Sequence, residues 1–304
     1  MNMYLKNLNK VFFLPYMSAA FLYFFIVAPA YPQNSSRISI YFTGSLRGNL
    51  SGCECSVKPN SGLVRRFSSL NKLFDKKRDI LLDTGDMLGF NDNEEKSSYI
   101  LKVFHRQGYD AVVPGYQDIT HPTGLVKKNR QAIPYVGVAD ISRIKKSILI
   151  EKSGFKIGII GFISPKVFRF SSRSPGEFGI KYNIDYIAAE SRFLRKKGAD
   201  FVILLAHVPR TIAVEMSRMT ELDAVIAGND QFQPKSKADI LVNGKYVLSA
   251  GGDDGEFIGK MVLEKKNGSV GVLNSELFAV NKLNPGSDPE INDWLKKHPA
   301  YDGR

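Results

Sequence analysis

The chain has 304 residues, of which 43% are hydrophobic, 11% aromatic and 24% charged, with 26 Gly, 14 Pro and 2 Cys. This composition excludes a disordered chain, a collagen-like chain and a disulfide-rich scaffold, and the length suits one large α/β domain or two small ones. The net charge of +12 permits anionic partners without choosing among nucleic acid, anionic lipid and phosphorylated ligands.

The first 30 residues have the pattern of an export signal. Lys6 and Lys10 precede an almost wholly apolar run, 11–27, which ends at Ala28-Pro29-Ala30. A basic start, an apolar stretch and a small-x-small cleavage site predict a signal peptide over residues 1–30. A retained membrane anchor is the alternative, although the run is marginal for spanning a bilayer; contact with the membrane would then be through this segment alone. We expect a periplasmic or extracellular protein, whose cysteines meet an oxidising compartment.

Strands and helices are predicted to alternate along residues 31–283, the expected domain. Strands are predicted at 38–42, 79–83, 111–113, 133–138, in a hairpin over 147–162, and at 201–206, 223–227, 246–249, 257–265 and 270–278; helices are predicted from residue 62, at 97–107 and at 184–197. This order predicts one α/β domain with a mixed sheet or two packed sheets. Residues 284–304 are predicted to be a C-terminal tail with a short helix around Trp294.

Polar residues follow five of these strands, where open α/β sheets place their functional sites. The segments are Thr43-Gly44-Ser45-Leu46-Arg47-Gly48, Leu82-Asp83-Thr84-Gly85-Asp86, Pro114-Gly115-Tyr116-Gln117-Asp118, Ala206-His207 and Gly228-Asn229-Asp230-Gln231.

This series resembles the calcineurin-like metallophosphoesterases, specifically the catalytic domain of the 5'-nucleotidase/UDP-sugar hydrolase family, over about residues 38–278. The resemblance implies two packed mixed β-sheets flanked by helices, a four-layer α/β/β/α sandwich. It also implies a site with two divalent metals, at which a metal-bound water or hydroxide attacks phosphorus. The large enzymes of the family carry a further nucleoside-binding domain, for which this sequence leaves no room, so we carry over no nucleotide specificity.

Several of the family's metal ligands are replaced in this sequence. Ser45 and Arg47 stand where the family has Asp-x-His, and Tyr116 stands where it has a metal-binding Asn. Asp86 and His207 remain as strong ligands, with Asn229 and Gln231 as weak oxygen donors. Because two divalent ions need several anionic or imidazole ligands, we expect no dinuclear centre, and either no metal or a single divalent ion.

Arginines near this site predict binding of a phosphate-like anion. Arg47 is expected to pair with Asp86 and replace the charge of a metal; in the alternative, it faces solvent and a mononuclear site survives. Arg65 and Arg66 open the helix from Gly62, whose N-terminal amides favour an anion. The other basic runs lack interleaved aromatic residues, so we expect no nucleic acid binding.

Cys53 and Cys55 lie on the first loop of the site. Together with Gly62-Leu63-Val64-Arg65-Arg66 they resemble an exported subgroup of the same family that commonly lacks the Asp-x-His pair. That resemblance suggests a redox or metal task and an exported redox protein as a partner. The alternatives are a strained, reducible disulfide, a reactive thiolate beside Arg47, soft metal ligands that join His207, and a structural loop disulfide.

Three functions follow from these patterns. The first is a non-hydrolytic exported protein that binds an anion or a partner on a phosphoesterase scaffold, with a redox or metal role for Cys53 and Cys55. The second is a phosphoric ester hydrolase with one metal at Asp86, His207, Asn229 and Gln231. The third is a docking protein of an exported electron-transfer complex. The candidate catalytic residues, whichever function holds, are Cys53, Cys55, Gln117 and Asp118.

Overall fold

The computed structural model describes residues 36–52, 61–129, 131–137, 144–169, 171–180, 184–219, 221–229, 239–242, 244–250, 252, 254–283 and 286–301. The predicted signal segment lies outside these ranges. Within them, no helix has the length and apolar character needed to cross a membrane.

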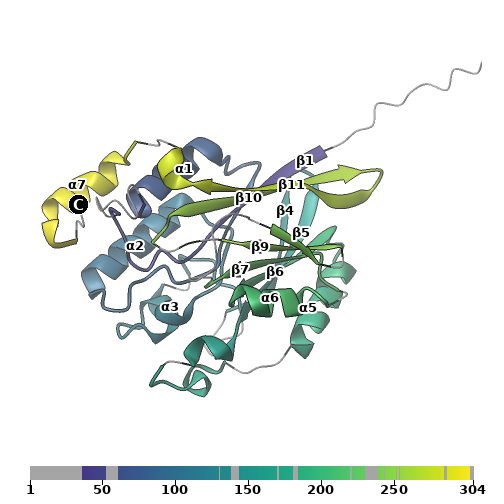
Figure 1. Ribbon diagram of the computed structural model, residues 1–304, viewed down its shortest axis with the longest axis horizontal. Helices are drawn as coiled ribbons and strands as arrows, with labels where there is room; N and C mark the ends of the chain where they lie inside the picture. The colour runs from purple at the N-terminus through teal and green to yellow at the C-terminus, as the bar shows by residue number, and fades with distance from the viewer. Residues whose placement is uncertain are drawn as a thin grey trace, which may run out of the picture. The chain divides into compact units, whose positions relative to one another are not determined.

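Two mixed β-sheets form the centre of the domain (Figure 1). The first has the order β11-β10-β1-β2-β3 and contains β1 (Ser36–Thr43), β2 (Ile80–Asp83), β3 (Ala111–Val112), β10 (Phe257–Lys266) and β11 (Ser269–Ala279). The second has the order β4-β5-β6-β7-β9-β8 and contains β4 (Ser147–Lys152), β5 (Phe155–Ile163), β6 (Phe201–His207), β7 (Ala224–Gly228), β8 (Asp239–Val242) and β9 (Lys245–Ser249). Strands β1, β2 and β3 are parallel, as are β5, β6, β7 and β9.

Alternating side chains along the strands build three apolar layers. On β1, Ile40 and Phe42 enter the core between the two sheets, whereas Tyr41 enters the core on the outer face. On β6, Ile203 lies between the sheets and Val202 on the outer face. Because successive strand residues point to opposite faces, each sheet is covered on both sides, which confirms the predicted four-layer α/β/β/α sandwich.

Helices cover the outer face of each sheet (Figure 1). The first sheet is covered by α1 (Leu63–Leu73), α2 (Glu94–Gln107) and α7 (Pro289–Lys297), and the second by α5 (Asp185–Lys196) and α6 (Arg210–Met216). Two short helices, α3 (Tyr116–Thr120) and α4 (Leu125–Lys128), and the 3-10 turns η1 (Pro165–Phe168) and η2 (Pro175–Phe178) complete one end of the domain; η3 (Val280–Lys282) and η4 (Pro299–Tyr301) flank α7.

The hairpin of β4 and β5, the antiparallel β10–β11 pair and all three predicted helices are present. Helix α2 starts three residues earlier than predicted because Asn93 caps it, accepting a hydrogen bond from the backbone N–H of Lys96. The predicted strand 133–138 is wrong: Tyr135 and Val136 make only isolated bridges, to Val112 and Lys145. Pro134, which lacks an N–H, precedes them and interrupts a ladder. Helices α3, α4 and α6 and strand β8 were not predicted.

The C-terminal helix belongs to the domain. Residues 34–304 form one compact unit, and Ile291 and Leu295 of α7 are buried in the same cluster as the α1 and α2 side chains. Trp294 stacks on Tyr99 of α2 with 4.0 Å between ring centroids. The helix around Trp294 is confirmed, but the boundary placed at residue 283 does not separate a tail from the domain.

Candidate functional site

The loops after β1, β2, β3, β6 and β7 converge at one edge of the two sheets. The backbone N–H of Ser45 donates to the carbonyl of Gly85 at 2.8 Å, and that of Arg47 donates to the carbonyl of Asp86 at 2.8 Å. A Cβ on Gly228, the last residue of β7, would lie 2.3 Å from Oγ1 of Thr84. Side chains from both sheets therefore meet beside Thr84, Gly85 and Asp86.

Asp86 and His207 face each other in this site. Nε2 of His207 lies 3.5 Å from Oδ2 of Asp86, and both side chains are buried. The other carboxylate oxygen of Asp86 accepts a hydrogen bond from the backbone N–H of Gln117 at 2.9 Å. Nδ1 of His207 lies 2.8 Å from the carbonyl oxygen of Thr84.

The Thr84 contact fixes the tautomer of His207. A carbonyl oxygen only accepts hydrogen bonds, so Nδ1 carries the proton that it shares with Thr84. In the neutral ring, Nε2 then presents a lone pair, and none of the residues that the structure describes forms a hydrogen bond with Nε2. A lone pair that faces a buried carboxylate calls for a positive charge between them. That charge is either a proton on Nε2 or a bound cation.

The loop around Asp86 is held from behind by Asp118, at the start of α3. Its carboxylate accepts hydrogen bonds from the backbone N–H groups of Asp86 at 2.8 Å, Leu88 at 2.9 Å and Gly115 at 2.7 Å. Burial, followed by the nearby Asp86 carboxylate, raises the pKa of Asp118 to about 8. Because both oxygens bond to the backbone, Asp118 positions the site; its place among the candidate catalytic groups is corrected accordingly.

Four residues of these loops have left-handed backbone conformations. Their φ angles are 47° for Ser45, 52° for Arg47, 56° for Asp86 and 65° for Asn229. Non-glycine residues adopt this region uncommonly, and such strain concentrates at functional sites. The cluster lies at the edge of the sheets where the sequence predicts the functional site.

The expected ion pair between Arg47 and Asp86 is not found. Among the titratable side chains of described residues, the one that faces the Asp86 carboxylate is His207, whose Nε2 lies 3.5 Å from Oδ2. The two loops instead meet through the backbone, where the N–H of Arg47 bonds to the Asp86 carbonyl. This backbone register brings the residues together without bringing their charged groups into contact.

Arg66 is not an anion-binding residue, contrary to the prediction. Its side chain is fully buried, 4.0 Å from the carboxylate of Asp83, and donates to the carbonyl of Gly44 at 3.2 Å. The amides at the start of α1 are also engaged, since the N–H groups of Leu63 and Val64 donate to the carbonyls of Asn49 and Leu50. Of the predicted anion-binding residues, Arg47 and the half-buried Arg65 remain as predictions.

Some of the remaining predicted residues are described by the structure, and the others lie outside the described residues. Tyr116 donates its hydroxyl hydrogen bond to Oγ of Ser171 at 2.8 Å, and Ser45 is buried. Gln117 is half-buried beside Asp86, so it stays a candidate. Asn229 directly follows β7 and stays a predicted weak donor. Cys53, Cys55 and Gln231 lie outside the described residues.

The donor set fits one metal ion better than two. Two ligands of a tetrahedral ion, each about 2.1 Å from it, lie about 3.4 Å apart, close to the 3.5 Å between Nε2 of His207 and Oδ2 of Asp86. Across the described part of the chain, no three His, Cys, Asp or Glu side chains gather as a metal site. Asp86 and His207 would thus be the protein ligands of a single ion, and the residues at the positions of a second ion's ligands do not fit it.

Sequence reasoning missed Thr84, whose carbonyl orients His207, because any residue type supplies a carbonyl. It also missed the tight approach of Gly44 and Gly228: a Cβ on either residue would lie within 2.3 Å of Oγ1 of Thr84. Two glycines at the ends of buried strands were the available signal.

Known proteins share this fold. The chain has the fold of the calcineurin-like phosphoesterases and 5'-nucleotidases. The calcineurin-like phosphoesterase YfkN from Bacillus subtilis superposes with a TM-score of 0.67 at 17% identity, covering 88% of this chain and 98% of that one. The NAD nucleotidase NadN of Haemophilus influenzae gives a TM-score of 0.72 at 14% identity, covering 88% and 68%.

A 5'-nucleotidase from Diplobatis ommata is 22% identical over 288 residues, covering 79% of this chain and 48% of that protein. The chain thus spans about half the length of this curated relative. No family model matches the chain.

Proposed function

We propose that this chain is an exported metallophosphoesterase-like protein that holds one divalent cation between Asp86 and His207 in place of a two-metal centre. It binds a phosphate-like anion there and hydrolyses phosphate esters poorly. The fold of the calcineurin-like phosphoesterases supports the proposal, as does the site at the carboxyl ends of β2 and β6.

The geometry of Asp86 and His207 is the observation that carries the proposal. Thr84 fixes the proton of His207 on Nδ1, which leaves Nε2 directed at Oδ2 of Asp86 at 3.5 Å. Hydrogen bonds from the backbone to Asp86 and from His207 to Thr84 orient both ligands, as second-shell contacts do in metal sites. A bound divalent ion would supply the missing positive charge and a binding position for an anionic oxygen.

The replaced residues support poor hydrolysis. Two-metal hydrolysis holds the attacking and leaving oxygens between ions about 3.5–4 Å apart. Ser45 and Arg47 follow β1 where acidic and imidazole ligands would be required, and the hydroxyl of Tyr116 bonds to Ser171. With one ion, we expect Arg47 to add positive charge for the anion.

Cys53 and Cys55 enter the proposal only as residues of the first site loop. A redox or metal role for this pair, and an exported redox partner, stay predictions. They can be checked by measuring the mass and the free thiols of the chain before and after reduction.

Calorimetric titration of the chelator-treated full chain with Zn²⁺ and Mn²⁺ tests the cation site. We expect one ion per chain, with affinity at least about tenfold weaker in Asp86→Asn and in His207→Gln. Asp293→Asn and His105→Gln, at exposed positions, are matched controls that should bind as the unaltered chain does. Two ions per chain, or one ion whose affinity ignores both site substitutions, would refute the proposed site.

Turnover of generic phosphate monoesters with added Mn²⁺, Zn²⁺ or Co²⁺ tests the second half of the proposal. We expect only slow hydrolysis. Robust turnover that Asp86→Asn abolishes would instead establish the mononuclear hydrolase. Absence of both cation binding and turnover would favour the docking function.

A further inference from the structure

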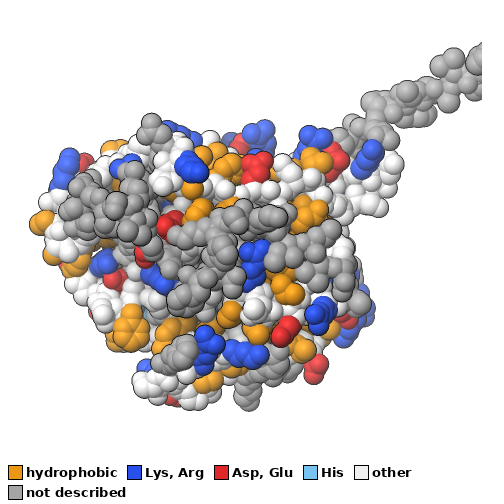
Figure 2. Space-filling view, viewed as in Figure 1, with side chains coloured by type: hydrophobic (Ala, Val, Ile, Leu, Met, Phe, Trp, Pro, Cys, Tyr) orange, Lys and Arg blue, Asp and Glu red, His pale blue; other side chains and the backbone are white. Residues whose placement is uncertain are grey.

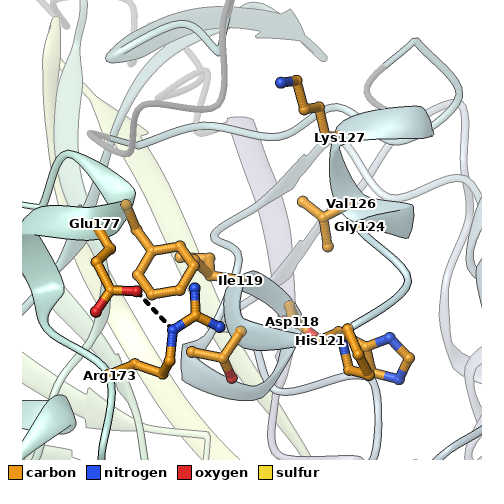
Figure 3. Close-up of a pocket in the computed structure, with 11 residues that line it drawn as sticks. Asp118, Ile119, His121, Gly124, Val126, Lys127, Arg173 and Glu177 are labelled. Atoms are coloured by element: carbon orange, nitrogen blue, oxygen red, sulfur yellow. Dashed lines mark hydrogen bonds and ion pairs between the residues drawn. The ribbon is translucent and has the colours of Figure 1, made fainter.

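A cavity of about 300 Å³ lies against α3 (Figure 3), and Asp118, which lines it, also accepts a hydrogen bond from the backbone N–H of Asp86. It is bounded by α3, by α4 with the turn before it, and by η2 with Arg173. Its volume is at the lower end of the range for small-molecule sites, about 300–1,000 Å³. A ligand with a single ring or a short branched chain would fill it.

One part of the wall is apolar. Ile119 of α3, Val126 of α4 and Phe178 of η2 line the cavity, as Figure 3 shows for the first two. Val126 is buried, and Phe178 packs on Phe168 with 5.7 Å between ring centroids. These contacts fix the apolar wall, so a ligand would meet a largely preformed surface.

The acidic and imidazole groups of the lining already have partners. Glu177 accepts from the backbone N–H of Ser174 at 2.7 Å and from Nε of Arg173 at 2.6 Å. Asp118 accepts hydrogen bonds from three backbone N–H groups. The two ring nitrogens of His121 contact the hydroxyls of Thr123 and Ser97. The lining therefore offers little to attract a cation.

Arg173 directs hydrogen-bond donors at the cavity. Its Nε bonds to Glu177, and its guanidinium lies 4.8 Å from the centre of the Phe178 ring. Throughout the described ranges no acceptor bonds to its Nη1 or Nη2, and Figure 3 shows the guanidinium directed toward the cavity beside Ile119. Two parallel N–H groups held in this way match the two oxygens of a carboxylate or phosphate.

We propose that this cavity is a second binding site, for a small organic anion whose apolar body lies against Ile119, Val126 and Phe178 and whose carboxylate or phosphate is bound by Arg173. The site does not depend on the cation proposed between Asp86 and His207. A ligand bound there would contact α3, which carries the residues that hydrogen-bond to Asp86.

Titration of the chelator-treated full chain with benzoate and with phenyl phosphate tests the site. We expect saturable binding of at least one of them, and weaker binding of benzyl alcohol, which lacks the charge, and of inorganic phosphate, which lacks the ring. Arg173→Gln should weaken binding by about tenfold or more because it removes a charged bidentate contact. Phe178→Leu should weaken the ring-bearing ligands alone.

Arg192→Gln is the matched control. Arg192 is an exposed α5 residue, paired with Glu221 at 3.1 Å, and its replacement should leave binding unchanged. Three results would overturn the proposal: no saturation by either anion at millimolar concentration, equal affinity in the unaltered chain and Arg173→Gln, or loss of binding in Asp86→Asn but not in Arg173→Gln. The last result would place the anion at the cation site.

Discussion

The guanidinium of Arg66 lies 4.0 Å from the carboxylate of Asp83, and solvent reaches neither side chain. Arg66 also donates to the carbonyl of Gly44, whereas Asp83 accepts from the hydroxyl of Thr43 and the N–H of Gly85. Burial raises the pKa of Asp83, and the charge of Arg66 opposes that rise. The pair therefore joins α1 to β2, and its hydrogen bonds reach Gly44 and Gly85 at the start of the two loops that carry Arg47 and Asp86.

Loss of Arg66 should destabilise the chain strongly. Arg66→Met keeps much of the side-chain volume but leaves Asp83 as a buried charge without its partner, which costs about 3–5 kcal/mol. Arg65→Ala, at the adjacent half-buried position, should change the free energy of unfolding by about 0.5 kcal/mol or less. Denaturant unfolding of both variants measures the difference. Equal effects would show that the buried pair contributes nothing specific.

His121 should make stability depend on pH. Burial lowers the pKa of His121 below its usual value of 6.5, and the nearby Asp92 opposes this. Just below pH 6.5 the unfolded chain therefore binds more protons than the folded chain. The free energy of unfolding accordingly falls as the pH drops through this region.

His121→Gln should abolish this part of the loss of stability at low pH. The difference in free energy of unfolding between the unaltered chain and the variant should therefore narrow or reverse between about pH 8 and pH 5. The measurement is chemical denaturation at several pH values, with His105→Gln, at an exposed position, as the control. A gap that stays constant with pH would contradict the prediction.

Gly228 should tolerate no side chain. A Cβ there would lie 2.3 Å from Oγ1 and 3.0 Å from the carbonyl oxygen of Thr84, which holds His207. Gly228→Ala should cost about 1–3 kcal/mol through overpacking and should weaken cation binding. Gly271→Ala is the control, because a Cβ on Gly271 of β11 meets no atom within 4 Å. Equal stability and equal cation affinity of the two variants would refute the expected crowding at Thr84.

The layered fold could be predicted because its signals are local. Runs of apolar residues that end in Gly, Asp or Asn marked β2 and β7, and strand ends then located the site. The error at Arg66 was also local. In a helix that starts at Leu63, residue 66 lies on the same face as Leu63, Phe67 and Leu70, all buried. The periodicity that predicted the helix thus already placed Arg66 in the interior.

The side chain that faces the Asp86 carboxylate could not be predicted from the sequence. Arg47 and His207 were both candidates to face the Asp86 carboxylate. Which of them does so depends on the backbone register between two loops of the first sheet and on a contact between the two sheets. Neither relationship produces a periodic pattern in the sequence. Residue type gave the candidates, and three-dimensional packing selected between them.

The stacking of Trp294 on Tyr99 has a practical consequence. Trp294 is the single tryptophan of the chain, and it joins α7 to α2. Its fluorescence therefore reports whether the C-terminal helix is attached. Far-ultraviolet circular dichroism reports separately on the secondary structure of the whole domain. If α7 detaches before the sheets unfold, the two optical signals will change at different denaturant concentrations, and the distance between the two midpoints will measure how cooperatively that helix is held.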